Sequence, residues 1–466
     1  MSDDLNEANH RVWPQSEYVP HDERPVQYLL NHWTFGGRAH AWEYTGWRDE
    51  TQSWKKTAYI HGHLNPSPTT KISGPDALKF LQAICVNSFQ KFQVGAARHA
   101  ILTDHFGKVG AHGILMRMAE DEFISFWLSP YLDYRATQFE DLDFELDYLT
   151  GETFLFQIGG PKSLEILEDA TEENLHDVAF LRHRPTRIAG TEVTILRIGM
   201  AATLSYEIHG PIEDAQKVYQ AIYDAGLPHG IRKLGVQAYM CEHTEGGFGQ
   251  AFYHMPLAWG PEDPGIFTFM KMVGFDFSEV VFTGSAGQDT SRRFLSPYDL
   301  GWGHMVNFNH EFPGRAALEA EAAANRTTMV TLVWNAEDVA EIVSSELRGG
   351  PEYTPMIIPN DFMYQVGYPA TTTGVLRADK VLVDGEDIGT TSGRTFTLWS
   401  HETISLAWID TRYVDEGTDV TVLWGDEGSN QKEIRAKVAR FPYLIDPVRN
   451  EKFDVSAIPS KYPVTV

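Results

Sequence analysis

The sequence predicts an α+β core built from two similar units, followed by an all-β domain. One unit begins at Lys71 with KISGPDALKFL, and the other, Phe154–Asp169, reads FLFQIGGPKSLEILED. Each has a short apolar run, a turn with Gly-Pro, and apolar residues at helical spacing, which indicates a strand, a turn and a helix. After Arg326 short segments of alternating polarity predominate, which is typical of a barrel or sandwich.

The domain organisation follows from these patterns. Residues 1–50 are polar and rich in aromatic residues, and we expect an irregular arm laid over a core. We expect residues 51–325 to form the duplicated core and residues 326–466 the β-domain. Residues 246–299 are rich in Gly and Pro and are expected to be weakly structured. The expected helices are Glu213–Asp224 and Leu234–Glu245, and the expected strands are Thr191–Ile198, Ser205–His209, Met329–Trp334, Lys380–Val383, Ile404–Ile409 and Asp419–Leu423.

Composition and charge narrow the class of protein. The 466 residues carry a formal net charge of −26. Nucleic-acid binding needs clustered Lys and Arg, and anionic membrane surfaces repel acidic proteins, so neither partner is expected. No apolar run reaches the roughly 18 residues of a membrane span. The acidic start MSDDLNEANH is not a secretory signal, and only Cys85 and Cys241 are present, so we expect a cytoplasmic protein.

The first unit carries motifs of a known family. Residues 73–81 read S-G-P-D-A-L-K-F-L, and two strands joined by Phe106-Gly107-Lys108 follow. These motifs resemble the folate-binding aminomethyltransferase family, which includes the glycine-cleavage T-protein and the tetrahydrofolate-dependent O-demethylases for vanillate and syringate. Residues 300–322 resemble the family's junction, where a buried strand leads into F-x-G-R-x-A-L. The resemblance implies duplicated ferredoxin-like βα units, a C-terminal β-barrel and tetrahydrofolate as co-substrate.

The segment from Arg197 to Ile208 resembles the family's pterin-binding segment. It reads R-I-G-M-A-A-T-L-S-Y-E-I, and Glu207 stands where the family has a Glu that accepts hydrogen bonds from the pterin ring. A carboxylate can accept two parallel N–H bonds from an aminopyrimidine edge. The resemblance therefore implies cofactor binding by Glu207, with Tyr206 and Arg197 beside it. The alternative is a solvated Glu on a strand face.

Two positions depart from the aminomethyltransferase pattern and indicate oxygen chemistry. Tyr239-Met240 replaces the family's Arg-Asp pair, as in the vanillate-type O-demethylases, and Ala111-His112 replaces an Asp. Tyr239 and His112 can each donate a proton to a departing oxygen, so the resemblance implies catalytic roles for both. The alternatives are a core Tyr on a helix and a His packed in a turn.

Histidine and aromatic side chains are expected to line the substrate site. His61 and His63 stand where the family has its L-F-D-x-S-H-M segment, and Trp127 is a third candidate for substrate contact. Further His residues lie nearby, but none completes a known metal spacing, so no metal is expected. The aromatic arm from Tyr28 to Trp54 would either cover a planar substrate or pack on the core.

These assignments predict transfer of a methyl group from a methoxy-aromatic substrate to N5 of tetrahydrofolate, giving 5-methyltetrahydrofolate and a phenol. Residues 126–130 show no basic residue that would fix a benzoate carboxylate, so the donor need not be a benzoate. Arg232, Lys233 and Arg394 are candidates to meet the anionic glutamate tail of folate.

Other classes stay open. One is an aminomethyltransferase of glycine cleavage, which works with a lipoyl carrier protein, or another N- or S-methyl demethylase of the family. Another is a non-catalytic folate-binding assembly factor, whose K-G-C-Y-x-G-Q segment is matched here only by residues 245–250, without the Cys. Whether the protein is a monomer or a homo-oligomer is not decided by the sequence.

Overall fold

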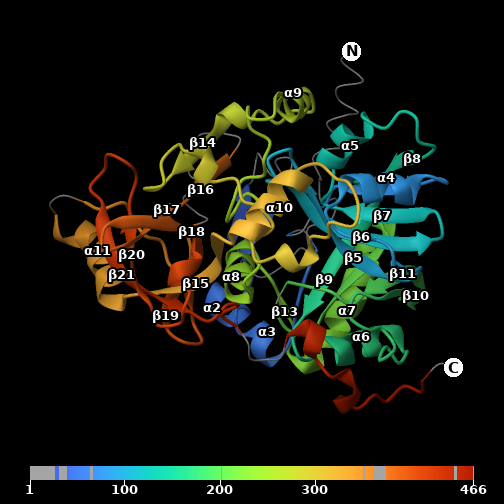
Figure 1. Cartoon of the computed structure of the whole chain (residues 1–466). Helices are drawn as coiled ribbons and strands as arrows, with labels where there is room; N and C mark the ends of the chain where they lie inside the picture. Colours follow the sequence, from blue (N-terminus) through green and yellow to red (C-terminus); the bar gives the residue numbers. More distant parts are fainter. Residues whose placement is uncertain are drawn as a thin grey trace.

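The computed structural model describes residues 27–30, 39–62, 64, 67–200, 202–349, 352–361, 374–444 and 449–464. Two α+β layers lie on one side of the molecule and a closed six-stranded barrel on the other (Figure 1). Helix α8 (Val236–Gly246) runs between them, near the centre of the view in Figure 1. This arrangement confirms the expected α+β core with a C-terminal barrel.

The first sheet has the strand order β5-β6-β7-β4-β8. Helix α4 (Ala77–Ile84) covers it with Phe80, Leu81 and Ile84, which are fully buried. Helix α5 (Tyr131–Ala136) follows β7. The strands are β4 (Thr69–Ser73), β5 (Ala97–Thr103), β6 (Val109–Ala119), β7 (Glu122–Phe126) and β8 (Glu145–Tyr148).

The second sheet has the order β10-β11-β12-β9-β3-β13. Helices α6 (Ser163–Thr171) and α7 (Ala215–Gly226) pack on one face of it through a separate apolar core. The strands are β3 (Tyr59–His61), β9 (Thr153–Gly159), β10 (His183–Ile188), β11 (Thr191–Leu196), β12 (Ser205–Pro211) and β13 (Arg232–Lys233).

The two sheets are copies of one design. In each, a three-stranded meander lies beside the strand that precedes the Gly-Pro turn, in the orders β5-β6-β7-β4 and β10-β11-β12-β9. The turn glycines have the same unusual backbone, with φ of +122° at Gly74 and +128° at Gly160. A Cβ there would lie 2.8 Å from the Asp143 carbonyl oxygen and 2.4 Å from that of Thr57. Close backbone approach therefore demands glycine at both turns.

The outer strands of the two sheets are exchanged. β3 precedes the first unit along the chain, yet it pairs with β9 of the second sheet. β8 precedes the second unit, yet it pairs with β4 of the first sheet. Each unit thus completes the sheet of the other, so neither sheet can be assembled from one unit alone.

The barrel closes in the order β15-β19-β18-β17-β20-β21. Helix α11 (Ala336–Arg348) packs beside it, so the expectation of an entirely β-structured C-terminal domain was wrong in this detail. The helix has a signal in the sequence, because Asn335 caps its first turn and Val339 and Ile342 are apolar at helical spacing. The strands are β15 (Thr327–Trp334), β17 (Asp379–Val383), β18 (Glu386–Thr397), β19 (Glu402–Asp410), β20 (Asp419–Trp424) and β21 (Lys432–Ala439).

The connecting regions differ from expectation. Between residues 246 and 299 the chain forms helix α9 (Pro264–Met272), capped by Asp263, and strand β14 (Val280–Thr283), which pairs with β16 (Gly374–Arg377). At the junction a 3-10 turn replaces the expected buried strand, and α10 (Arg315–Ala324) follows. The described part of the arm forms β1 (Gln27–Leu30), β2 (Ala39–Glu43), α2 (Trp47–Glu50) and α3 (Ser53–Lys56). Within the described ranges, no helix is long and apolar enough to cross a membrane.

Replacing Gly113 on β6 by Ala should cost at least about 3 kcal/mol of unfolding free energy. A Cβ at this position would lie 1.9 Å from the Phe126 carbonyl oxygen, so β6 and β7 would have to separate. Urea-induced unfolding measures the effect. Gly190→Ala is the control, because its φ is +81° but no atom lies within 4 Å of the added Cβ. Backbone strain alone should cost about 1 kcal/mol there. If both substitutions lowered the free energy of unfolding equally, the contact between the added Cβ and the Phe126 carbonyl oxygen could not be the cause.

Candidate active site

Three polar side chains form a row across the second sheet. In the strand register Glu207 of β12 lies opposite Gln157 of β9, and Gln157 lies opposite His61 of β3. Directly opposed residues on neighbouring strands place their side chains on the same face. The other face of these strands holds apolar residues such as Ile60 and Ile158, which pack against α6 and α7. The row therefore faces away from the helices.

Helix α8 lies over this row and adds three side chains. Tyr239, Glu242 and His243 are three and four residues apart, so they share one face of the helix. The Glu242 Oε1 atom lies 2.5 Å from the Tyr59 hydroxyl, and that hydroxyl lies 2.8 Å from Gln157 Oε1. We call the seven residues Tyr59, His61, Gln157, Glu207, Tyr239, Glu242 and His243 the α8 cluster.

The rings of the α8 cluster are in contact. His61 stacks on Tyr59 at 5.8 Å and meets the edge of Tyr239 at 5.0 Å. Tyr239 in turn lies 4.4 Å from the His243 ring. Aromatic contacts in the cluster therefore connect the face of the sheet to the face of the helix. The two carboxyl groups of the cluster belong to Glu207 on the sheet and Glu242 on the helix.

Several buried polar atoms of the α8 cluster have no hydrogen-bond partner among the described residues. They include Glu242 Oε2 and His243 Nε2. Leaving such a group unpaired costs about 1–3 kcal/mol. Polar groups of a ligand that reached these atoms would satisfy them, so the α8 cluster is the candidate for the active site.

The anchoring of α8 explains how these side chains are held. Glu50 accepts hydrogen bonds from the backbone of Tyr44 at 2.6 Å and of Gly235, just before α8, at 2.8 Å. On the opposite side of the helix, the Thr244 hydroxyl donates to the Gly393 carbonyl of the barrel at 2.7 Å. The helix is therefore tied to the arm at its start and to the barrel near its end.

The aromatic arm packs against the α8 cluster. Trp42 and Trp54 are buried beside Tyr59 and Tyr239, and the Trp54 indole donates to Glu245 at 3.1 Å. Within the described part of the arm, packing on the core therefore accounts for these aromatic residues. Trp33, Phe35 and the side chain of Tyr28 lie outside the described residues.

Burial sets the charge states in the cluster. It raises the pKa of Glu242 to about 8 and lowers the pKa of His61 to about 3 and of His243 to about 4. The pKa of Tyr239 is held well above its usual range by burial and by the nearby carboxyls Glu242 and Glu207. At neutral pH the two histidines are thus neutral and Glu242 is largely protonated.

His112 lies apart from Tyr239. Its ring contacts His99, with 3.1 Å between their nitrogens, and Trp302 at 4.4 Å. The Phe248 ring stands between, 5.4 Å from His112 and 6.4 Å from His243. Burial and His99 lower the pKa of His112 well below its usual range. Its imidazole is therefore neutral at neutral pH, and a catalytic role for His112 stays a prediction.

Two of the residues expected to bind the cofactor face elsewhere. Tyr206 neighbours Glu207 on β12, so its side chain points to the opposite face and is buried against α6 and α7. Arg197 donates to Asn450 Oδ1 at 3.0 Å and to the carbonyls of Asn450 and Phe453, both at 2.8 Å. It clamps the C-terminal segment, which lies beside α6 (Figure 1). Neither side chain lies in the α8 cluster, and pterin contact by Tyr206 and Arg197 stays a prediction.

The other candidates are placed as follows. His61 belongs to the α8 cluster, whereas His63 lies outside the described residues. Trp127 packs in the apolar cluster between the two sheets, next to Phe126, whose ring lies 4.6 Å from His209. Its contact with substrate stays a prediction. Among the described residues, no group of three or more ligating side chains is arranged to hold a metal.

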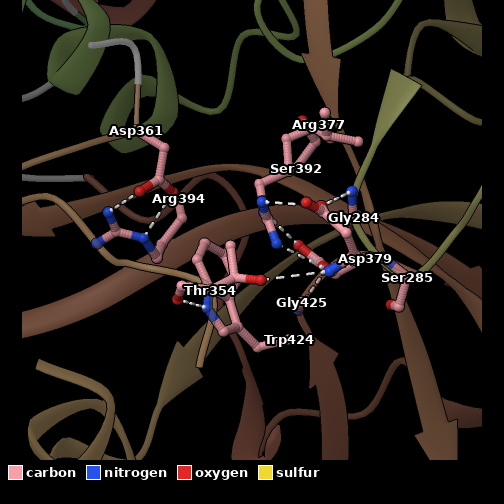
Figure 2. Close-up of polar contacts among 12 residues, drawn as sticks. Gly284, Ser285, Thr354, Asp361, Arg377, Asp379, Ser392, Arg394, Trp424 and Gly425 are labelled. Atoms are coloured by element: carbon pink, nitrogen blue, oxygen red, sulfur yellow. Dashed lines mark hydrogen bonds and ion pairs between the residues drawn. The ribbon is translucent and has the colours of Figure 1, made fainter. Parts of the chain in front are cut away.

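The cations considered for the folate tail already have internal partners. Arg232 pairs with Asp49 at 2.6 Å, and Lys233 lies over the Tyr44 and Tyr223 rings. Arg394 is buried near the barrel, where it pairs with Asp361 beside a second pair, Arg377 and Asp379, around Trp424 (Figure 2). The Arg394 pair is part of the structural packing of the barrel.

Sequence reasoning missed Tyr59, Gln157, Glu242 and His243. Three of them could have been predicted from the spacing of the sequence. Glu242 and His243 follow Tyr239 at helical spacing, and Tyr59 lies two residues before His61, on the same face of a strand. Gln157 needed the register between β9 and β12, which no local pattern contains.

Comparison with known proteins assigns the family. The model of the GCVT N-terminal domain family matches residues 17–266, more than half of the chain, so the protein belongs to this family. The family uses tetrahydrofolate as co-substrate, and the protein is a folate-dependent transferase. The resemblance drawn from the motifs of the first unit is thereby confirmed.

Two relatives match along most of their length. Sesamin methylene transferase from Sinomonas sp. (strain No.22) is 44% identical over 90% of this chain and 93% of that protein. Syringate O-demethylase from Sphingobium sp. (strain NBRC 103272 / SYK-6) is 30% identical over 86% of this chain and 89% of that protein. Among solved structures, the glycine cleavage aminomethyltransferase T from Bartonella henselae has a TM-score of 0.63 over 90% of this chain and 94% of that chain. At 16% identity this likeness shows the fold alone.

The stability of the protein should fall as pH rises from about 6.5 to about 8. Burial raises the pKa of Glu242 to about 8 and of Glu50 and Glu245 to about 7. An unfolded Glu titrates near 4.3, so the folded state holds extra protons and loses stability as they leave. Buried His61 and His243 act in the opposite sense, but only below about pH 6.5, where unfolded His becomes charged.

Urea-induced unfolding across this pH range measures the slope. Glu242→Gln should flatten it, because the amide has no proton to lose. A variant with the wild-type slope would show that Glu242 is ionised throughout the range.

Proposed function

We propose that the protein transfers a one-carbon unit from an aromatic ether to tetrahydrofolate. With a methoxy donor, the methyl group moves to N5 and leaves 5-methyltetrahydrofolate and a phenol. The observation that carries the proposal is the α8 cluster, in which unpartnered donors and acceptors lie among aromatic rings. The name of the relative at 30% identity, a syringate O-demethylase, supports this reaction class.

A methylene donor is the second candidate. The relative at 44% identity is named a methylene transferase. An aromatic methylenedioxy ring carries such a unit between two oxygens, and its transfer to tetrahydrofolate would give 5,10-methylenetetrahydrofolate and a catechol. Both reactions break a carbon–oxygen bond of an aryl ether and leave a phenolic oxygen that needs a proton.

The residues can be given roles in this reaction. Glu207 would accept hydrogen bonds from the pterin, since its carboxylate is buried in the row across the second sheet. Tyr239 would hold the ether oxygen through its hydroxyl, since its ring lies between those of His61 and His243 in the α8 cluster. His61 and its stacked neighbour Tyr59 would form a flat wall. Holding both reactants in line can contribute about 7–11 kcal/mol to lowering the barrier.

A panel of donors tests the function. The wild-type protein is incubated with tetrahydrofolate and guaiacol, veratrole, vanillate or 1,3-benzodioxole, and folate products are identified by mass spectrometry. We expect 5-methyltetrahydrofolate from the methoxy donors or 5,10-methylenetetrahydrofolate from benzodioxole. Turnover that proceeds equally fast without tetrahydrofolate would refute the proposal, and so would folate products from glycine-cleavage substrates alone.

Replacing Glu207 by Ala should weaken tetrahydrofolate binding about 10- to 150-fold, because hydrogen bonds to a charged group contribute about 1.5–3 kcal/mol. Isothermal titration calorimetry measures the dissociation constant. Glu192→Ala is the matched control, since Glu192 is exposed on the neighbouring strand β11 and pairs only with Arg187 at the surface. An unchanged dissociation constant in Glu207→Ala would exclude Glu207 from the pterin site.

A further inference from the structure

We propose that Glu242 protonates the departing ether oxygen in this one-carbon transfer, and that Tyr59 and Gln157 hold it in position to do so. The inference rests on the proposed function and adds the source of the proton. Glu242 lies one helical turn after Tyr239 on the same face of α8, so both residues meet the same face of the second sheet.

The contacts around Tyr59 indicate which oxygen of Glu242 can carry a proton. The Tyr59 hydroxyl donates to Glu242 Oε1 at 2.5 Å, and Gln157 Oε1 lies 2.8 Å from the same hydroxyl. Because Oε1 already accepts this hydrogen bond, a proton on Glu242 belongs on Oε2. The pKa of Glu242, raised to about 8 by burial, indicates that this proton is present at neutral pH.

The surroundings of Glu242 favour the neutral form and leave one oxygen available. Its side chain is 1% exposed, and Oε2 has no partner among the described residues. Tyr59 from β3 and Tyr239 and Glu245 from α8 interact with it, and the other titratable groups of the α8 cluster are His61, Glu207 and His243. None of these is a cation at neutral pH, because burial lowers the pKa of both histidines.

The other groups near the reaction are weaker acids. Burial and the neighbouring carboxyls hold the pKa of Tyr239 well above its usual range, and His61 and His243 are neutral. A proton donor works best when its pKa lies near the working pH. Tyr239 then orients the ether oxygen by a hydrogen bond, while Glu242 supplies the proton.

The step balances without an oxidant or a reductant. The carbon–oxygen bond of the donor breaks while the carbon–N5 bond forms. The proton of Glu242 goes to the oxygen that departs, which leaves as a phenol. The proton that N5 gives up after the transfer returns to the Glu242 carboxylate, so the residue ends the cycle as it began.

Glu242→Gln tests the proposal, since the amide keeps the shape of the side chain but cannot give up a proton. We expect kcat to fall about 100-fold or more, with KM for tetrahydrofolate unchanged. In the wild-type protein kcat should fall as pH rises through about 8, where Glu242 loses its proton, and this limb should be absent in the variant. Tyr59→Phe should move the limb to higher pH, because the Tyr59 hydrogen bond lowers the pKa of Glu242.

Donors with a more acidic phenol separate the two residues on α8. A nitro-substituted methoxyarene leaves with less need for a proton, so the deficit of Glu242→Gln should shrink on it. The deficit of Tyr239→Phe should stay, because Tyr239 orients the donor. Glu245→Gln is the matched control: Glu245 is buried on the same helix but bonded to Trp54, and the variant should keep the wild-type kcat.

Infrared difference spectroscopy gives a readout that needs no turnover. The wild-type protein should show the carbonyl band of a protonated carboxylic acid that titrates near pH 8 and is absent in Glu242→Gln. A missing band would mean that Glu242 is ionised, which overturns the proposal. A wild-type kcat in a folded Glu242→Gln variant would also overturn it. If no aryl ether is turned over by the wild-type protein, the proposed function fails, whatever the band shows.

Discussion

The exchange of β3 and β8 between the two sheets is the constraint on which the site depends. A strand buried between two neighbours must pair its backbone groups on both sides. β9 finds its second partner in β3, which reaches it from the chain before the other unit. This pairing brings His61 and Tyr59 beside Gln157 and Glu207. Because side chains alternate along a strand, a slip of one residue in β3 would turn both rings toward α6 and α7 and dismantle the row.

The site lies between the core of the second sheet and a smaller apolar cluster that includes Tyr59 and Tyr239. On one side the second sheet packs on α6 and α7, and on the other α8 is tied to the arm and the barrel. The polar side chains between them are held by this packing and by the hydrogen bonds that join Tyr59 to Glu242 and Gln157. This explains how a layer with unpaired donors and acceptors persists in a folded protein: the surrounding cores offset its cost. Arg197, directly after β11, also attaches the C-terminal segment to this sheet through its hydrogen bonds to Asn450.

Much of the fold was predictable from local patterns. The two Gly-Pro turns, the α8 helix and the alternating strands of the barrel each have a signal of short range. The alternation of side chains along β12 was also readable, and it places Tyr206 on the face opposite to Glu207. Arg197 could not be placed, since its partner Asn450 lies 253 residues away. The row itself depends on strand register, and register between distant strands is a property of the tertiary structure.

The buried acid on α8 also bears on how this protein would respond to laboratory evolution. A carboxyl group enclosed at 1% exposure reduces stability at neutral and alkaline pH, and an apolar or amide side chain of similar size would relieve that burden. Libraries sorted for heat resistance alone would therefore enrich substitutions at position 242 while discarding the proton on which turnover is proposed to depend. Substitutions intended to raise the melting temperature should be placed first on the outer face of α11 and on the barrel, far from that carboxyl group.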